Sequence, residues 1–239
     1  MLFLLLPIIS VATAASTRLP PSDIRYTECQ ADILLEKYDY KVPPQNIDQN
    51  IECDRERAID ANVANGEIPL LFDKIRENGW LIVPFYFDNL EPSGTHSEEE
   101  RSIVRKKLLQ FEEHTCIKVR EVTRNDTFYE HRLRITRKDE GCWSYVGAQT
   151  IQRTLTQQIN LGPGCTDDSI PQHEVMHALG FWHEQQRGDR DDYVDLHRIN
   201  CNLTDDAWQS NFEKVPWLPS PHVYDYNSVM QYRYVSTFC

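Results

Sequence analysis

The sequence predicts an α+β fold, because strand-like and helix-like segments follow one another in runs and not in regular alternation. A strand pattern comes first, then one long amphipathic helix, then several short alternating segments, and then a histidine-rich stretch at residues 171–190. The chain has 239 residues, of which 40% are hydrophobic and 10% aromatic, so it can form one packed domain preceded by a leader.

The first predicted strand is the apolar stretch W-L-I-V-P-F-Y-F. In it Val83, Phe85 and Phe87 alternate with Pro84 and Tyr86, which is the period of two that a strand requires. The globular pattern of the chain begins here.

A helix is predicted next, ending near His114. Ser97 and Glu100 form a capping box, in which each side chain satisfies a backbone N–H at the start of the helix. The acidic first turn also suits the positive end of the helix dipole. The apolar positions that recur at helical spacing are Ile103, Val104, Leu108 and Phe111.

Four further strands are predicted. C-I-K-V-R-E-V at 116–122 and R-L-R-I-T-R at 132–137 alternate apolar and polar residues, as a strand does. W-S-Y-V-G at 143–147 and T-Q-Q-I-N-L at 156–161 are the other two candidates. This order of strand, helix and strands ahead of the histidines is the basis of the α+β prediction.

Two segments precede the predicted domain. Residues 1–15 predict a secretory signal peptide, because a short apolar run containing a proline leads into small residues of the A-x-A type. Residues 16–76 are polar, proline-dotted and without clear periodicity, so they predict a pro-segment. Residues 77–239 remain for the folded domain. No segment after the first has the about 18 consecutive apolar residues that a membrane span needs.

The cysteine content and the charge narrow the class of protein. Seven cysteines without a C-x-x-C pair indicate disulfides formed in an oxidising compartment. N-glycosylation sequons at Asn125 and Asn202 agree with secretion. The net charge of −12 argues against a nucleic-acid-binding surface, which needs a clustered basic face.

The stretch P-Q-H-E-V-M-H-A-L-G-F-W-H-E predicts a metal centre. His173 and His177 stand four residues apart, so on a helix they share one face and can hold one ion. Gly180 can adopt the left-handed conformation that ends a helix, which would bring His183 back to the same ion. Three imidazoles satisfy zinc and leave a position open for water, as in catalytic sites.

This stretch resembles the extended zinc signature of the metzincin proteases, and Glu184 after the third histidine is similar to the astacin branch. C-W-S-Y-V-G at 142–147, R-G-D-R-D-D-Y-V at 187–194 and Y-D-Y-N-S-V-M-Q-Y at 224–232 resemble further astacin motifs, the last one the Met-turn. The resemblance implies a metzincin-type fold with a twisted N-terminal sheet, an active-site helix and an irregular C-terminal subdomain, which is shortened here.

The resemblance also implies a role for each residue of the site. His173, His177 and His183 would bind one Zn²⁺ per chain. Glu174 would act as general base on a zinc-bound water and then as proton donor. Because zinc lowers the pKa of bound water towards about 7, a carboxylate can take that proton near neutral pH.

The Met-turn segment would complete the site. The resemblance makes Tyr232 a displaceable ligand and the donor to the transition-state oxyanion, Met230 a hydrophobic floor, and Glu184 the anchor of the mature N-terminus. Gln231 departs from the family pattern, which has histidine at this place, and the departure bears on the positioning of Tyr232.

Cysteine pairing follows the resemblance in part. Cys142 and Cys165 match a family disulfide that braces the strand along the cleft. Cys116 matches a cysteine whose partner lies well beyond the Met-turn, whereas this chain stops at Cys239. Either the C-terminal part of the catalytic domain is missing, or Cys239 pairs with Cys116 or Cys201. Cys29 and Cys53 could pair within the pro-segment.

Together these features predict a secreted, extracellular zinc metalloendopeptidase, made as a zymogen, that cleaves internal bonds of extracellular proteins and peptides. The candidates for the zinc-blocking residue of the pro-segment are Glu67, Asp60 and Cys53. Activation cleavage is expected after Lys74 or Arg76, or near Pro69. The alternative is a secreted, non-enzymatic zinc-binding remnant or binding module with a truncated protease fold. Intact Glu174 and three ligands favour the enzyme, and Gln231 with the short C-terminus favours the alternative.

Overall fold

The computed structural model describes residues 24–27, 47–48, 76–90, 94–129, 131–147, 156–198, 203–215 and 223–232. The predicted signal peptide and four of the seven cysteines lie outside these residues, as do the three candidates for the zinc-blocking residue. None of the helices in the described part of the chain has the length and apolar character to cross a membrane.

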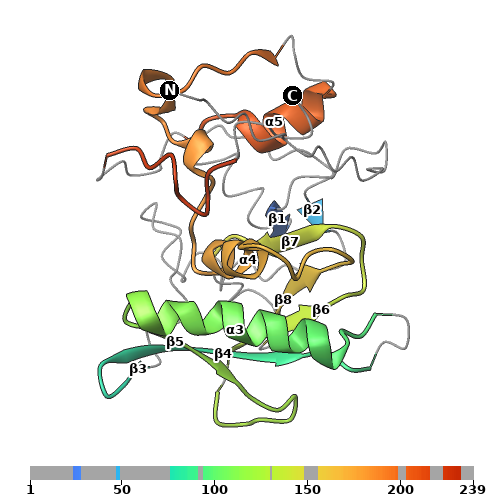
Figure 1. The fold of residues 1–239 in the computed structure, drawn as a ribbon. Helices are drawn as coiled ribbons and strands as arrows, with labels where there is room; N and C mark the ends of the chain where they lie inside the picture. Colours follow the sequence, from blue (N-terminus) through green and yellow to red (C-terminus); the bar gives the residue numbers. More distant parts are fainter. Residues whose placement is uncertain are drawn as a thin grey trace, which may run out of the picture.

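One mixed sheet forms the base of the fold (Figure 1). Its strands are β1 (Ile24–Thr27), β2 (Ile47–Asp48), β3 (Arg76–Glu77), β4 (Trp80–Phe87), β5 (Ile117–Glu121), β6 (Arg132–Thr136), β7 (Cys142–Tyr145) and β8 (Thr156–Leu161). Their order is β2-β1-β7-β8-β6-β4-β3, and β5 pairs with β4. β3 is antiparallel to β4 and β7 is antiparallel to β8, whereas the other pairs are parallel.

The helices are α3 (Glu98–His114), α4 (Ile170–Ala178) and α5 (Asp205–Phe212), with single 3-10 turns at η4 (Glu184–Gln186) and η5 (Arg190–Asp192). In Figure 1, α3 and α4 lie against the sheet, while α5 lies apart from it with the segments that follow α4. This mixture of one sheet and a few helices confirms the predicted α+β class.

The capping box predicted at the start of α3 is present. The Glu100 N–H donates to the Ser97 hydroxyl over 3.2 Å, and the Ser97 N–H donates to the Glu100 carboxylate over 2.7 Å. Val104, Leu108 and Phe111 are buried on the inner face of the helix. The apolar spacing therefore identified the face that packs on the sheet.

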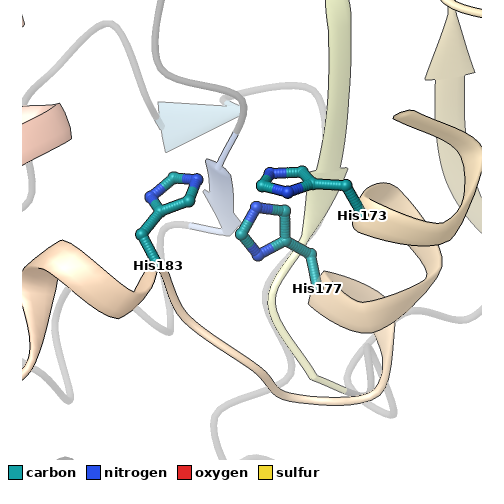
Figure 2. Close-up of side chains that lie close together, drawn as sticks. All are labelled: His173, His177 and His183. Atoms are coloured by element: carbon teal, nitrogen blue, oxygen red, sulfur yellow. The ribbon is translucent and has the colours of Figure 1, made fainter. Parts of the chain in front are cut away.

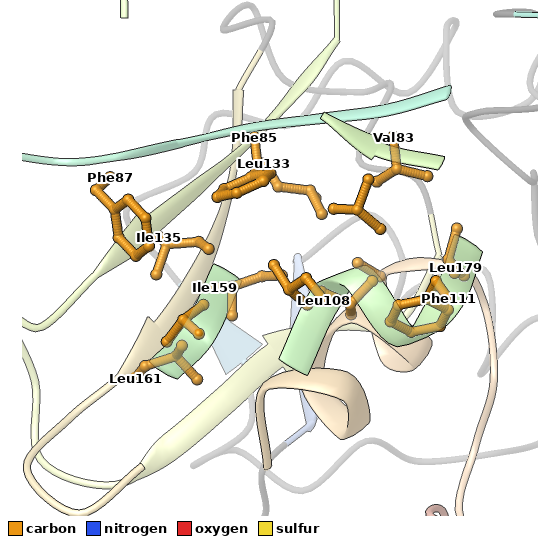
Figure 3. Packing of buried hydrophobic residues seen from close by; sticks show 14 of the residues in the cluster. Val83, Phe85, Phe87, Leu108, Phe111, Leu133, Ile135, Ile159, Leu161 and Leu179 are labelled. Atoms are coloured by element: carbon orange, nitrogen blue, oxygen red, sulfur yellow. The ribbon is translucent and has the colours of Figure 1, made fainter. Parts of the chain in front are cut away.

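The core lies between the sheet and the two helices (Figure 3). Val83, Phe85 and Phe87 of β4 face Leu108 and Phe111 of α3 across this layer. The other strands and α4 contribute Val119, Leu133, Ile135, Ile159, Leu161, Val175, Ala178 and Leu179. Burial of a large apolar side chain stabilises a fold by roughly 1.5–3 kcal/mol, so this layer fixes α4, and with it the histidines, against the sheet.

The four short strands predicted after the helix are all formed, as β5, β6, β7 and β8. β1 and β2 were not predicted, because they lie in the proline-dotted segment that shows no periodicity. β1 pairs in parallel with β7, with Ile24 opposite Ser144 and Arg25 opposite Tyr145. Part of the predicted pro-segment therefore extends the sheet beside the strand next to α4.

The disulfide between Cys142 and Cys165 is formed, with the two Cα atoms 5.6 Å apart, and this part of the cysteine prediction is confirmed. It joins the start of β7 to the loop ahead of α4. Cys116 is exposed and forms no disulfide with another cysteine of the described residues.

Candidate metal centre

α4 carries the first two histidines. Pro171 stands in the first turn of the helix, where its missing N–H costs nothing. Val175 and Ala178 turn towards the core and are buried, at 2% and 0% exposure. His173 and His177, one turn apart, project from the helix towards His183 (Figure 2).

The helix ends as the sequence predicts, at Gly180. This glycine has a φ of 100°, in the left-handed region that side chains other than glycine rarely adopt. The Gly180 N–H donates to the His177 carbonyl over 2.8 Å, and the Phe181 N–H donates to the Met176 carbonyl over 3.0 Å. These two bonds form a Schellman motif, which reverses the chain and directs residues 181–183 back across the end of α4.

The reversal brings His183 to the other two histidines. One ring nitrogen from each of His173, His177 and His183 lies within 4.8 Å of the others. His177 and His183 are fully buried, and His173 is partly exposed. Figure 2 shows the three rings converging, two from α4 and one from the loop that follows it. The structure therefore brings together the three residues that the sequence proposes as ligands.

The outer nitrogen of each ring is held by an oxygen. The Nδ1 atoms of His173 and His177 lie 2.8 Å and 2.7 Å from the carbonyls of Val229 and Phe181, and the Nδ1 of His183 lies 2.7 Å from the Gln186 side-chain oxygen. Because these oxygens only accept, each Nδ1 must carry the proton when the ring is neutral. Each Nε2 then holds a lone pair for a metal ion.

This donor set fits zinc. Three neutral imidazoles are a zinc-binding set that leaves a coordination position open, and their orientation by outer oxygen partners is the usual support of such ligands. Within the described residues, these three are the group of metal-binding side chains close enough to share an ion.

Glu174 follows His173 on α4 and is buried, with 1% of its surface exposed. Its burial agrees with the role predicted for this carboxylate, which directly follows His173 in the sequence.

The Met-turn supports the site through its backbone. The Val229 carbonyl holds His173, and the Met230 carbonyl accepts from the Glu184 N–H over 2.9 Å. Met230 itself is buried, at 3% exposure. The segment thus connects the first histidine with the residue after the third.

Tyr232 lies beside the histidines, with its ring centroid 4.5 Å from that of His183. Its hydroxyl is 2.8 Å from the Asn211 side-chain oxygen. The Asn211 amide nitrogen donates to the Ala207 carbonyl over 2.7 Å, which fixes the oxygen of the amide towards Tyr232. The Tyr232 hydroxyl therefore donates to Asn211, while the Tyr232 ring packs against His183.

Gln231 takes up two contacts next to Tyr232. Its side chain donates to the Tyr232 carbonyl over 2.9 Å and accepts from the Tyr224 hydroxyl over 2.5 Å. Burial, and after it the Glu184 carboxylate, raise the pKa of Tyr224 to about 12, so this hydroxyl stays a donor at neutral pH. Gln231, which departs from the family pattern, thus links Tyr224 to the backbone of Tyr232.

Glu184, the predicted N-terminus anchor, is engaged by its own segment. Its carboxylate accepts from Arg187 over 2.7 Å and from the Asp225 N–H over 3.0 Å. The Arg187 guanidinium also binds Asp189 and lies over the Tyr224 ring, 5.3 Å from its centroid. The R-G-D-R motif therefore forms a folded unit with the Met-turn segment.

Three polar residues that support the site were not identified from the sequence. Gln186 holds His183, Asn211 holds the Tyr232 hydroxyl, and Gln185 accepts from the Tyr232 N–H over 3.1 Å. A signal for α5 was present, because Thr204 followed by two aspartates is a helix start, and the Thr204 hydroxyl does accept from the Ala207 N–H. The glutamines carry no such signal.

Comparisons with known proteins agree with this site. The family model "Astacin (Peptidase family M12A)" matches residues 74–238. The chain is similar to zinc metalloproteinase nas-13 of Caenorhabditis elegans, with 36% identity over 59% of this chain and 29% of the relative. It is also similar to bone morphogenetic protein 1 of Xenopus laevis, with 34% identity over 59% of this chain and 19% of the relative.

A solved structure shows the same fold. High choriolytic enzyme 1, a hatching enzyme zinc-protease from Oryzias latipes, matches with a TM-score of 0.54 and 30% identity, over 67% of this chain and 72% of that one. The chain spans less than a third of the length of the two curated relatives above. The family model nevertheless covers more than half of the chain, and the chain belongs to the astacin family of peptidases.

Proposed function

We propose that this chain is a zinc endopeptidase that hydrolyses internal peptide bonds. The observation that carries the proposal is the convergence of His173, His177 and His183, each with its Nδ1 held by an oxygen acceptor. The family membership supports the same reaction, since the relatives named above include zinc metalloproteinases.

His173, His177 and His183 would hold the zinc ion through their Nε2 atoms. When bound, zinc lowers the pKa of a coordinated water and polarises a carbonyl oxygen. Three protein ligands keep one position open for these tasks.

Glu174 serves as the general base and afterwards as proton donor to the leaving amine. A base must lie within reach of the proton that it takes. The burial of Glu174 and its position directly after His173 on α4 support this role. General acid–base catalysis of this kind contributes about 10²- to 10⁴-fold to a rate.

Tyr232 donates a hydrogen bond from its hydroxyl to the developing oxyanion. Its ring lies against His183, and the hydroxyl is a donor, as its bond to Asn211 requires. In this proposal the hydroxyl exchanges the Asn211 oxygen for the oxyanion, which supplies stabilisation of the oxyanion-hole kind.

The chain is proposed to be secreted and to act on extracellular proteins. The signal-peptide pattern of residues 1–15 and the disulfide between Cys142 and Cys165 support secretion, because disulfides persist in oxidising compartments. It is proposed to be made as a zymogen, with residues 16–76 as the pro-segment.

The test is hydrolysis of a quenched peptide by the full chain after limited trypsin treatment, with and without a zinc chelator. Hydrolysis that the chelator abolishes and added Zn²⁺ restores is expected for the parent. Glu174→Ala is expected to lose about 10²- to 10⁴-fold of the rate. The matched control is Glu113→Ala, which removes a carboxylate from the exposed face of α3 and is expected to keep full activity.

Absence of chelator-sensitive hydrolysis in the activated parent would overturn the proposal and favour the non-enzymatic alternative. Full activity in Glu174→Ala would leave a zinc enzyme but refute the role of this carboxylate.

A further inference from the structure

We propose that Gln186 is a positioning residue of the metal centre, and that the end of α5 determines through it which nitrogen of His183 faces the metal. The proposal rests on the proposed function insofar as His183 is a zinc ligand. Beyond that function, it proposes that α5, a helix that contributes no ligand itself, orients His183.

The C-terminal end of α5 is capped by side chains from the segment that follows His183. The last carbonyls of a helix have no partner within the helix and need donors from elsewhere. Gln186 donates to the Ser210 carbonyl over 3.3 Å and to the Glu213 carbonyl over 3.5 Å. The neighbouring carbonyls of Asn211 and Phe212 accept from the side chains of Gln185 and Arg190, respectively.

This capping fixes the orientation of the Gln186 amide. A backbone carbonyl only accepts, so the side of the amide that faces Ser210 and Glu213 must be the NH₂ group. The other side, the oxygen Oε1, then faces His183 at 2.7 Å from Nδ1. An inverted amide would place an oxygen against two carbonyls and an NH₂ group against a ring N–H.

The orientation of the amide in turn fixes the proton on His183. Since Gln186 Oε1 can only accept, Nδ1 must be protonated and Nε2 must carry the lone pair. His183 and Gln186 are both fully buried, at 0% exposure, so water does not offer an alternative partner. The carbonyls of α5 thus select the tautomer of His183 that can bind a metal through Nε2.

The backbone holds Gln186 in place for this task. Its carbonyl accepts from the Val215 N–H over 2.8 Å, and its N–H donates to the His183 carbonyl over 3.1 Å. The backbone of Gln186 is therefore tied both to His183 and to the chain just past α5. A loss of the side-chain amide leaves these backbone bonds in place.

The experiment compares Zn²⁺ affinity in the full chain, measured by competition with a chelating dye, for the parent, Gln186→Met and Gln158→Met. Methionine keeps the length of the side chain and removes both hydrogen-bonding groups. Gln158 of β8 is the matched control, because its side chain also makes two hydrogen bonds, to Arg134 and Thr136, and neither of these partners belongs to the metal centre.

Gln186→Met is expected to weaken zinc binding by about 10- to 100-fold, the usual effect of removing an outer partner of a ligating histidine. Gln158→Met is expected to bind zinc nearly as tightly as the parent, although both variants lose stability. Equal affinity in Gln186→Met and the parent would overturn the proposal, whereas a parent without zinc affinity would overturn the proposed function.

A second measurement needs no variant at Gln186 and decides the matter if Gln186→Met does not fold. Long-range proton–nitrogen NMR of the zinc-free chain at pH 8 reports the tautomer of each imidazole, and His183→Asn identifies the His183 signal by its loss. A proton on Nδ1 is expected. A proton on Nε2 contradicts the proposal.

Discussion

At the scale of the residue, each proposed ligand of the metal centre is oriented by an oxygen that the spacing of the histidines does not identify. Val229 lies 56 residues after His173 and holds it through a carbonyl, while Phe181 and Gln186 hold His177 and His183 from within the loop. The spacing of the histidines predicted where they would meet. The acceptors that orient them depend on the tertiary fold, and so could not be predicted from that spacing.

The role of the Tyr232 hydroxyl can be separated from the role of its ring. Tyr232→Phe keeps the packing against His183 and Phe212 but removes the donor. Loss of one oxyanion donor costs about 10²- to 10³-fold in kcat, and we expect this loss with little change in KM. Steady-state kinetics of the activated chain measures both.

Tyr226→Phe is the matched control for this change, since Tyr226 is 58% exposed and donates only to the Tyr193 carbonyl among its described bonds. It is expected to keep the parent rate. An unaltered kcat in Tyr232→Phe would remove the hydroxyl from the mechanism.

His96 makes stability depend on pH. It is buried at 3% exposure, and its Nε2 donates to the Leu161 carbonyl over 2.8 Å. Burial lowers the pKa of His96 below its ordinary value of 6.5, against the attraction of Glu100 and with the repulsion of Arg137 and Arg101. The unfolded chain therefore takes up a proton more readily than the folded one.

The contribution of His96 is complete above pH 6.5 and is lost as the pH falls below that value towards the lowered pKa of the folded state. We expect the free energy of unfolding to fall over this range, and to fall less steeply in His96→Gln. Urea denaturation at a series of pH values measures the two slopes. The exposed His114 provides the control, and His114→Gln should keep the slope of the parent.

At the scale of the element, sequence patterns predicted the helices and strands whose structure depends mainly on their own residues. The capping box and the apolar spacing predicted α3, and the alternating segments predicted β4 to β8. β1 was missed because its pairing is decided by β7, more than a hundred residues away, and not by a pattern of its own. α5 was missed although Thr204 and two aspartates start it, because its apolar face is short.

Gly180 ends α4 and begins the turn that leads to His183, so its replacement should affect both the stability of the helix end and the metal centre. Gly180→Ala places a side chain at a φ of 100°, which costs about 1–2 kcal/mol. Because the Schellman turn directs the chain to His183, we expect a lower unfolding midpoint together with weaker zinc binding. Thermal unfolding and dye competition report the two effects separately.

Gly188→Ala is the control, since a Cβ there would meet no atom within 4 Å and its φ is not in the left-handed region. It should keep both the midpoint and the affinity. A Gly180→Ala chain that binds zinc as tightly as the parent would show that the turn does not position His183.

At the scale of the whole molecule, the predicted pro-segment and the domain share one sheet. β1 pairs with the side of β7 that β8 leaves open, and the Gly147 N–H just after β7 donates to the His177 carbonyl over 2.8 Å. The strand that the resemblance assigns to the cleft is therefore paired on both sides in this chain. A substrate strand could pair there only after β1 has left.

We accordingly expect the intact chain to be inactive and to gain activity when cleavage releases the segment that carries β1. The structure distinguishes between two of the predicted cleavage points. Arg76 pairs with Leu81 in the β3–β4 hairpin, and the Glu77 carboxylate accepts from the Tyr129 hydroxyl over 2.8 Å. Because proteases require an extended segment free of strand pairing, the bond between residues 76 and 77 should resist trypsin, and activation should follow cleavage ahead of β3.

Limited trypsin treatment of the parent, Lys74→Gln and Arg76→Gln checks this order. Lys74→Gln should slow the gain of activity, whereas Arg76→Gln should activate at the rate of the parent. N-terminal sequencing should show that the active material begins before Glu77. Because the Arg120 guanidinium also holds the Glu77 carboxylate, at 2.8 Å, Arg120→Leu should loosen β3 and open the second bond to trypsin. Active material that begins at Glu77 in the parent would contradict the prediction, since the hairpin would then offer no protection to the bond between residues 76 and 77.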